Sequence, residues 1–581
     1  MCLQKRIPLF SSNYEIGKTY IENGYNFTFI RLLIIIEAKS RSSKNAFERI
    51  YIMLDTLIKN VEVFDGTGAS PSIESVGIKD GKIVSVSKES AMEANTIIDG
   101  TGLSLSPGFI DSHTHSDFHL FQNPSRWEKL KQGITTEIGG QCGWSLAPFP
   151  KTTPKEFRDY TVTFLKSPGF DSYKHAMNCL DSMDLGVNQA SFVGHGYIRG
   201  VAMGMDNRTP TAKELDFMCA MTEEAMQSGA LGLSSGLVYA PGVYANREEL
   251  IQLAKIVAKY GGRYSTHIRN EGDYLVEAIQ EAIEIAKAAD VSLNISHLKA
   301  LFPMNFHKID IVLEMINKEI EQGMDITFDA YPYAACSATI LSTLPPSYLV
   351  NGVDWLTDHL RQKENVDLLR KAIYEPTETW ENPVAKIGVD NLLVSSAPHT
   401  PDAVGKRISE YAKLKGLDDI EAYAEIIQLN HGEVMDIRFA MSEDNIEQIY
   451  RHPRCMVGTD GLYEGNDAPS HVRAFASFPR YLGHYIRDRK LLSMEEGIRR
   501  ISGMPADVYG LVGKGYIKEG YDADLVLFDK EKICDKATYT DPFIPNEGIH
   551  MVMINGKAAV INNELTGVME GRKILRSNER K

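Results

Sequence analysis

The chain carries two patterns of apolar and polar positions, one near both of its ends and one through its middle. Short segments with the character of β-strands occupy residues 57–64, 76–78, 83–86, 524–529 and 551–554. Asp80-Gly81 lies between the second and third of these segments, a spacing that predicts a β-hairpin with a tight turn. The two clusters are far apart in sequence, and together they predict one small β domain built from both ends of the chain.

The middle of the chain alternates compact apolar segments with helical patterns. The apolar segments are residues 108–113, 134–139, 190–195, 230–235, 263–268, 291–297, 325–331 and 456–460. Between them, stretches such as 212–228, 247–260 and 273–289 place apolar residues three and four positions apart, as amphipathic helices do. Eight strands alternating with helices predict a parallel sheet that closes on itself. The expected fold class is therefore α/β: a TIM (β/α)8 barrel with a small β-sandwich domain formed from both termini.

An unusually long gap precedes the eighth predicted strand. Residues 338–452 exceed what one helix needs, so we expect an inserted lobe there, entered through the loop at Leu344-Pro345-Pro346. The expected domains are the first part of the β domain at 53–106, the barrel at 107–509 with its insertion at about 338–452, and the second part of the β domain at 510–581.

The first 52 residues need a separate interpretation. Residues 29–38 are apolar, but the run includes Arg31 and is shorter than the roughly 20 residues needed to span a bilayer. It also lies too far from the start, without a nearby small-residue cleavage site, to resemble a signal peptide. We expect Met53 to be the natural beginning and residues 1–52 to be poorly packed or a misassigned start, with an amphipathic membrane anchor as the alternative.

Composition narrows the possible partners. Of the 581 residues, 43% are hydrophobic and 24% charged, as in ordinary soluble globular proteins, and the formal net charge is -15. That charge argues against nucleic acid, so the expected partner is a small molecule. A substrate carboxylate would need a few locally placed cations. The seven cysteines are scattered, odd in number and without a C-x-x-C pair, which favours a reducing cytoplasm over a disulfide framework.

Side chains that bind metals recur at the ends of predicted strands. They are His113 and His115 at the first strand, Cys142 after the second, His267 at the fifth, His297 at the sixth and Asp460 at the eighth. Taken singly, each has an ordinary explanation as a hydrogen-bonded histidine, a small buried thiol or a turn residue. In a TIM barrel, however, the C-terminal ends of the strands meet at one mouth. Imidazole, thiolate and carboxylate are preferred zinc ligands, so the set predicts a metal centre.

Several motifs in this order carry a specific resemblance. They are PGFIDSHTHSD, the G-x-C-G around Cys142, GALGLSSGLVYAPG, THIRNEGD, ISHLK, DAYPYAACS and GTDG. The chain resembles the amidohydrolase superfamily in these runs, and within it the D-aminoacylases, which are N-acyl-D-amino-acid deacylases. The resemblance extends from Met53 to the C-terminal region.

The resemblance implies roles for the candidate ligands. Cys142 would be a metal-bridging thiolate, at a place where hydantoinases and dihydroorotases use a carboxylated lysine. His267 and His297 would complete one tight zinc site, and a second, weaker site would lie among His113, His115 and Asp460. Asp460 is also the expected general base, because a carboxylate can take a proton from water and return it to the leaving amine.

Four further residues match those that hold the substrate's α-carboxylate in the family: Lys299, Tyr331, Ser337 and Arg473. Taken singly, Lys299 and Arg473 could be solvated surface charges. Glu271 is expected to orient His267 or Arg269. The family commonly has His-Pro-Arg where this chain has His471-Val472-Arg473, and the resemblance does not fix how Arg473 is aimed.

These observations predict a zinc-dependent enzyme that hydrolyses N-acyl-D-amino acids to a carboxylic acid and a free D-amino acid, with the D-specificity implied by the resemblance alone. The nearest alternative is another amidohydrolase acting on a cyclic amide or dipeptide, of the hydantoinase, dihydroorotase or isoaspartyl dipeptidase type. An alternative from another class is a catalytically inactive scaffold that keeps the fold. The preferred side chain and acyl group, the number of metals needed and the oligomeric state stay open.

Overall fold

The computed structural model describes residues 53–88, 92–162, 169–463 and 470–576. The expectation for residues 1–52 falls outside this range. All structural statements below concern the described residues.

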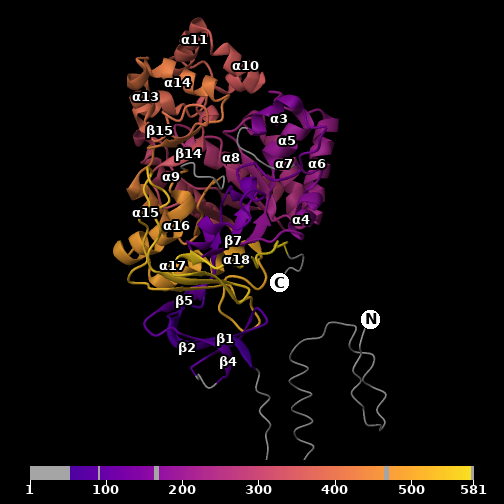
Figure 1. The fold of residues 1–581 in the computed structure, drawn as a ribbon. Coiled ribbons are helices and arrows are strands. Elements are labelled where there is room, and N and C mark those ends of the chain that lie inside the picture. The colour runs from indigo at the N-terminus through magenta and orange to yellow at the C-terminus, as the bar shows by residue number, and fades with distance from the viewer. Residues whose placement is uncertain (1–52, 89–91, 163–168, 464–469, 577–581) are drawn as a thin grey trace, which may run out of the picture. The chain divides into compact units, whose positions relative to one another are not determined.

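Strands from both ends of the chain form one mixed sheet, with parallel and antiparallel pairs, as the sequence predicts (Figure 1). Its strands are β1 (Leu54–Val63), β2 (Ser72–Lys79), β3 (Lys82–Ser87), β4 (Ala94–Asp99), β5 (Ser104–Pro107), β18 (Leu525–Phe528), β19 (Ile549–Ile554), β20 (Lys557–Ile561) and β21 (Glu564–Leu565). β5 joins the two halves because it pairs with β1 on one side and with β18 on the other. Because the strand pairing is continuous through β5, the nine strands form one sheet. The two facing layers of a β-sandwich stay a prediction.

Each of the eight apolar segments of the middle overlaps at least one strand, and the segment 190–195 overlaps two. The strands are β6 (Phe109–Asp111), β7 (Ile134–Gly139), β8 (Asn188–Ser191), β9 (Val193–Gly194), β10 (Gly232–Gly236), β11 (Arg263–His267), β12 (Ser292–Ile295), β13 (Ile326–Ala330) and β17 (Cys455–Val457). They pair in parallel, as a three-stranded sheet β6-β7-β8 and a six-stranded sheet β17-β13-β12-β11-β10-β9.

The two parallel sheets are connected at both of their ends. A parallel bridge joins Thr114, just after β6, to Gly461, just after β17. At the other end Phe192 alone separates β8 from β9, and the Leu231 amide donates to the Ser191 carbonyl (2.9 Å). β7, β10, β11 and β13 are buried at every position, as parallel strands covered by helices are.

Helices follow the parallel strands. They are α2 (Trp127–Leu130), α3 (Lys155–Val162), α4 (Tyr173–Leu180), α5 (His195–Met203), α6 (Ala212–Gln227), α7 (Arg247–Lys259), α8 (Leu275–Ala289), α9 (Lys308–Glu321), α15 (Glu443–Arg451), α16 (Arg473–Arg480), α17 (Met494–Arg500) and α18 (Gly503–Tyr509). Of these, α6, α7 and α8 begin and end close to the stretches predicted at 212–228, 247–260 and 273–289. The residues before and within the first turn of α6 explain why this helix begins at Ala212. The Thr211 side chain accepts the Glu214 amide while Glu214 bonds back to Thr211, which is a capping box.

The residues of the expected insertion form a small sheet and several helices of their own. Its antiparallel sheet has the order β14 (Cys336–Thr339), β16 (Met435–Arg438), β15 (Leu392–Ser396), and its helices are α10 (Gly352–His359), α11 (Lys363–Tyr374), α12 (Pro383–Ile387), α13 (Ile408–Lys415) and α14 (Asp419–Leu429). These elements lie together in Figure 1. The segment between β13 and β14 is only five residues long, so the lobe begins close to a strand end of the parallel sheet.

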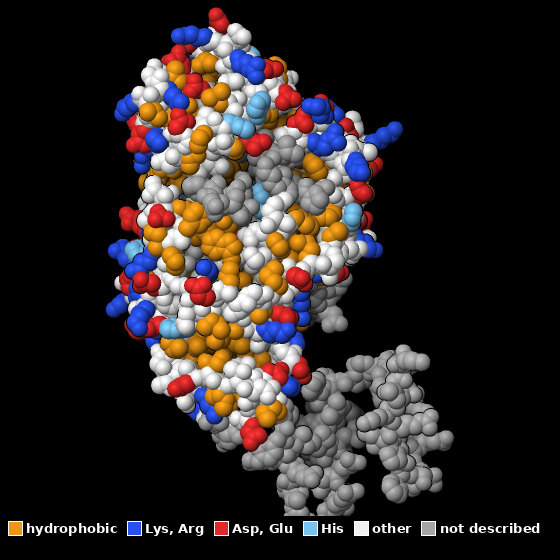
Figure 2. Space-filling view, in the orientation of Figure 1, with side chains coloured by type: hydrophobic (Ala, Val, Ile, Leu, Met, Phe, Trp, Pro, Cys, Tyr) orange, Lys and Arg blue, Asp and Glu red, His pale blue; other side chains and the backbone are white. Residues whose placement is uncertain are grey.

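Figure 2 shows acidic and basic side chains interspersed over the described part of the face in view. Among the helices that the structure describes, none combines the length and the apolar character that crossing a bilayer requires.

Candidate metal centre

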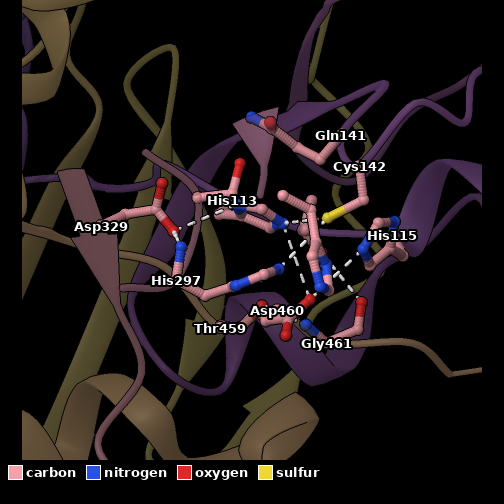
Figure 3. A network of polar contacts seen from close by, with 12 residues as sticks. His113, His115, Gln141, Cys142, His297, Asp329, Thr459, Asp460 and Gly461 are labelled. Carbon is pink, nitrogen blue, oxygen red and sulfur yellow. Dashed lines mark hydrogen bonds and ion pairs between the residues drawn. The ribbon is translucent and has the colours of Figure 1, made fainter. Parts of the chain in front are cut away.

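The structure brings the six predicted metal-binding side chains together at the carboxyl ends of the parallel strands. Figure 3 shows His113, His115, Cys142, His297 and Asp460. The Cys142 thiol lies at the centre of one group, because its Sγ is 3.3 Å from Nε2 of His113 and 3.3 Å from Nε2 of His297. These residues follow β7, β6 and β12, so three separate strands contribute to the group.

Asp460 holds the second group together. Its Oδ1 lies 3.3 Å from Nε2 of His115 and 3.6 Å from Nε2 of His113. His113 therefore belongs to both groups. His267, the last residue of β11, lies in a third group with His297 and Glu271, in which the possible ligand atoms are within 4.8 Å of one another.

Three of these residues adopt a backbone conformation that side chains rarely take. Cys142, His297 and Asp460 have φ angles of 53°, 35° and 48°, in the left-handed region that favours glycine. Such conformations cost of order 1–3 kcal/mol each and persist where the surrounding structure imposes them, often at functional sites. That all three residues lie in one cluster supports a functional site independently of the side-chain distances.

A carboxylate that the sequence analysis did not single out, Asp329 of β13, orients two of the histidines. Its Oδ1 accepts the amide of His297 (2.8 Å) and lies 3.0 Å from Nδ1 of His113, and its Oδ2 accepts from Asn294 (2.8 Å). The other ring nitrogen of His113 faces Cys142, so the contact with Asp329 fixes the direction of the ring. The available signal was a carboxylate inside an otherwise apolar buried strand, which requires polar partners.

Glu271 serves two ring nitrogens of the cluster. Its Oε1 lies 3.1 Å from Nδ1 of His297 and 2.6 Å from Nζ of Lys299, and its Oε2 lies 3.6 Å from Nε2 of His267. The expected contact with His267 is present, whereas Arg269 bonds Glu281 instead (2.9 and 3.0 Å). Because α8 places Glu281 within reach of the guanidinium, Glu271 stays free for the histidines.

A buried lysine ties together the two segments that carry His113, His115 and Asp460. The ammonium of Lys129, on α2, donates to Asp111 (2.7 Å), to Thr114 Oγ1 (2.8 Å) and to Thr459 Oγ1 (2.9 Å). Thr459 also donates its amide and its hydroxyl to Asp111 (2.8 and 2.7 Å). Lys129 is fully buried, so these bonds replace its whole hydration shell.

We therefore expect Lys129→Met to destabilise the protein by about 3 kcal/mol in urea unfolding, because the Asp111 carboxylate is left buried without its cation. We also expect kcat to fall about tenfold, with KM nearly unchanged, since the residue acts only through the segments it positions. Lys131→Met is the control, because Lys131 directly follows the same helix and holds its ammonium over the Trp127 ring. Unchanged stability and kcat in Lys129→Met would remove Lys129 from this role.

The charges of the cluster suit a cation. Burial opposes ionisation of the Cys142 thiol, but neighbouring His113 and His297 outweigh it and hold its pKa well below the usual value. Burial likewise opposes the charge on Asp460, and Arg473 and His297 hold the pKa of that carboxyl well below its usual range. The surroundings thus favour the anionic form of both groups, which is the form in which a thiol or a carboxyl binds a metal.

The residues fit a metal ion. His267 is buried, and neither of its ring nitrogens has a hydrogen-bond partner among the described residues. Glu271 lies 3.6 Å from its Nε2, beyond hydrogen-bond distance, so this buried imidazole is costly unless something else takes its lone pair. Imidazoles, one thiolate and one carboxylate form the donor set of a zinc-type site.

The predicted substrate residues lie around two cavities beside the cluster. Lys299, Tyr331 and Ser337 line a cavity of about 440 Å³ together with His267, His297 and Asp460. A second cavity of about 90 Å³ shares Ser337 and Asp460 with the first and is also lined by Arg473.

Arg473 contacts the site in spite of its Val472 neighbour. Its Nη1 lies 2.8 Å from Oδ2 of Asp460, its Nη2 donates to the Ser337 carbonyl (2.9 Å), and its guanidinium lies 4.7 Å from the centre of the Tyr331 ring. Its backbone amide donates to His471 Nδ1 (3.0 Å), a contact that positions the start of α16. Arg473 and Lys299 are therefore buried cations that face carboxylates, not solvated surface charges.

Sequence comparison with known proteins gives a family model and individual relatives that agree with one another. A model described as the amidohydrolase family matches residues 372–560. The chain is 33% identical over 505 residues to the N-acyl-D-glutamate deacylase of Alcaligenes xylosoxydans xylosoxydans, covering 87% of this chain and 93% of the relative. It is 31% identical over 526 residues to the D-aminoacylase of the same organism, covering 90% and 98%.

A solved structure is similar over the same extent. The crystal structure of N-acyl-D-glutamate deacylase from Bordetella bronchiseptica, complexed with zinc and a phosphonate inhibitor that mimics the tetrahedral intermediate, has a TM-score of 0.77 and 30% sequence identity. The similarity covers 90% of this chain and 100% of that one.

Proposed function

We propose, from the premise that this chain belongs to the D-aminoacylase family of the amidohydrolases, that it hydrolyses the amide bond of N-acyl-D-amino acids to a carboxylic acid and a free D-amino acid. The observation that carries the proposal is the position of Cys142 between His113 and His297, with Asp460 beside His113 and a cavity lined by His297 and Asp460.

We also propose that the two parallel sheets are two arcs of one (β/α)8 barrel. The Thr114–Gly461 bridge and the short connection through Phe192 support closure, since they continue the pairing at both ends of the series. Closure would explain why ligands from β6 and β17, at opposite ends of the sheet order, lie side by side.

The metal in this proposal is zinc. Cys142, His267 and His297 would hold the tight site, with Cys142 bridging to a weaker site among His113, His115 and Asp460. When bound, zinc supplies Lewis acidity, which polarises the scissile carbonyl and lowers the pKa of water. The described cysteines are all free, which supports a reducing compartment such as the cytoplasm.

The chain's own residues supply binding and proton transfer. Lys299, Tyr331, Ser337 and Arg473 would hold the substrate's α-carboxylate. The ammonium of Lys299 already faces the Glu271 carboxylate, and the guanidinium of Arg473 faces the Asp460 carboxylate. Both cations are therefore directed at places where a carboxylate can bind. Asp460 would accept a proton from water and return it to the nitrogen of the leaving amine.

The direct test is hydrolysis of paired N-acetyl-D- and N-acetyl-L-amino acids by zinc-loaded enzyme. We expect kcat/KM for the D enantiomers to exceed that for the L enantiomers by at least about 100-fold, because the carboxylate, side chain and amide cannot all occupy their places in the mirror image. Turnover of L substrates alone would contradict the D-specific proposal and leave the amide hydrolysis standing.

The same panel separates the alternatives. Hydantoin, dihydroorotate and an isoaspartyl dipeptide test the cyclic-amide and dipeptide activities, and preferred turnover of any of these would replace the proposal. A chain that binds no zinc by elemental analysis and hydrolyses none of the substrates would be the inactive scaffold.

A further inference from the structure

The larger cavity has an aliphatic wall beside the carboxylate-binding residues. Ser337 lies on β14, and the chain runs directly from β14 into two short 3-10 helices, η4 (Ile340–Thr343) and η5 (Pro346–Leu349). Leu341, Leu344 and Leu349 of this segment line the cavity and are 0%, 2% and 5% exposed. Val238, Val243 and Leu301 add further aliphatic surface. A group attached next to a carboxylate held at Ser337 would therefore reach this wall.

The position of this wall is fixed by polar contacts of its backbone and of Ser342. The Trp380 indole donates to the Thr343 carbonyl (3.3 Å), and Tyr244 donates to the Pro346 carbonyl (3.0 Å). Arg438 donates to Ser342 Oγ (2.8 Å) and to the Thr339 carbonyl (3.1 Å). The leucine side chains are thus presented by a backbone anchored at several points.

Every cation that lines the cavity already has an acidic partner. Lys299 bonds Glu271 (2.6 Å), and Arg269 bonds Glu281 through two nitrogens. The remaining two pairs are Arg438 with Asp436, through Nε at 3.0 and 3.1 Å, and Arg247 with Glu284. Among the lining residues there are five carboxylates (Glu271, Glu277, Glu281, Glu381 and Asp460) and four cations.

Binding of the substrate's α-carboxylate already requires the positive charge of Lys299. The α-carboxylate of an N-acyl amino acid would share Lys299 with Glu271. A second carboxylate on the side chain would then have to share one of the other described lining cations, each already bonded to Glu281, Asp436 or Glu284, in a cavity with more carboxylates than cations. Glu381 shows the effect within the protein. Burial and the nearby Glu271 charge raise the pKa of its carboxyl to about 7, although it accepts the Glu271 amide (2.8 Å).

We infer that this enzyme prefers N-acyl-D-amino acids with uncharged, aliphatic side chains over those with acidic ones, and that Leu344 and Leu349, with Leu341 packed behind them, form the wall that contacts the side chain. The inference rests on the proposed function. It selects among possibilities that the similar proteins leave open, because one of them is named for D-glutamate substrates and another for D-amino acids in general.

The test is a comparison of kcat/KM for N-acetyl-D-leucine, -D-glutamine, -D-glutamate, -D-aspartate and -D-lysine with zinc-loaded, full-length enzyme. Glutamine and glutamate are the matched pair, because they have almost the same size and differ in charge. We expect leucine to exceed glutamate by at least about 100-fold and glutamine to exceed glutamate by at least about tenfold, since an unpaired charge is costly to bury.

The outcomes separate the inference from the function on which it rests. Hydrolysis of D substrates with glutamate, aspartate or lysine equal to leucine or better would overturn the inference and leave the deacylase function standing. Absence of turnover for every D substrate would overturn both.

A pair of variants tests the wall itself. Leu344→Arg places a cation on the wall, and Leu344→Met keeps the volume without the charge. We expect the leucine-to-glutamate ratio of kcat/KM to fall at least about tenfold in Leu344→Arg and to change less than about threefold in Leu344→Met. An unchanged ratio in Leu344→Arg, with wild-type zinc content and melting temperature, would remove Leu344 from the wall. The wild-type panel decides the preference whether or not the arginine variant folds.

Discussion

Cys142→Ala is expected to weaken zinc binding at least about 100-fold and to lower kcat/KM by at least a similar factor. The thiol lies 3.3 Å from both His113 and His297, and the same histidines stabilise its anion. Alanine removes both the negative charge and the lone pairs, so His113 and His297 would face each other with no anion between them. Zinc content measured by elemental analysis after dialysis, and zinc titration monitored by competition with a chelator, check the result.

Cys455→Ala provides the matched control for this experiment. Cys455 is also buried and lies on β17, near Asp460, but its thiol donates to the Met456 carbonyl and takes no part in the cluster. We expect its zinc content to equal that of the wild type. If Cys142→Ala retained its full complement of zinc at micromolar free metal, the thiolate would not be a bridging ligand.

The sequence was sufficient to predict the strands and the cluster because both depend on local patterns. β11 ends at His267, and the predicted strand at 263–268 contains it. Once the strand ends are known, parallel pairing brings their side chains to one edge. The six candidate ligands could therefore be selected without knowing a single contact between them.

The contacts that orient the ligands could not be predicted in this way. Lys129 bonds Asp111 from 18 positions away and Thr459 from 330 positions away, and nothing in the pattern around α2 marks it as buried. Asp329 had a detectable signal, a carboxylate in a buried strand, but its partners His113 and His297 come from two other strands. Buried polar pairings depend on tertiary geometry, and spacing along the chain does not encode it.

The pairing of Arg473 with Asp460 has a consequence for catalysis that sequence did not suggest. Arg473 was expected to hold the substrate's carboxylate, and Asp460 was expected to act as the base. In the structure the two lie 2.8 Å apart. A substrate carboxylate bound to Arg473 would share the guanidinium with Asp460. One cation would then hold both the carboxylate of the substrate and the carboxylate that accepts the proton.

Asp460→Asn is expected to lower kcat by about 1000-fold or more while the protein keeps its tight zinc site. The amide has nearly the size of the carboxylate but cannot take a proton from water. The tight site proposed for Cys142, His267 and His297 does not include this side chain. We expect KM to change by less than about fivefold, because the loss of the Asp460 charge leaves Arg473 free to bind the substrate's carboxylate.

Glu277→Gln is the matched control, because Glu277 lines the same cavity, is exposed, and loses the same charge on substitution. Steady-state kinetics with N-acetyl-D-leucine, together with zinc content and melting temperature, separate a catalytic loss from a loss of metal or of fold. Wild-type kcat in Asp460→Asn would show that another group accepts the proton. A fall in KM with an unchanged kcat would assign Asp460 to the restraint of Arg473 alone, because only proton transfer requires the carboxylate to be a base.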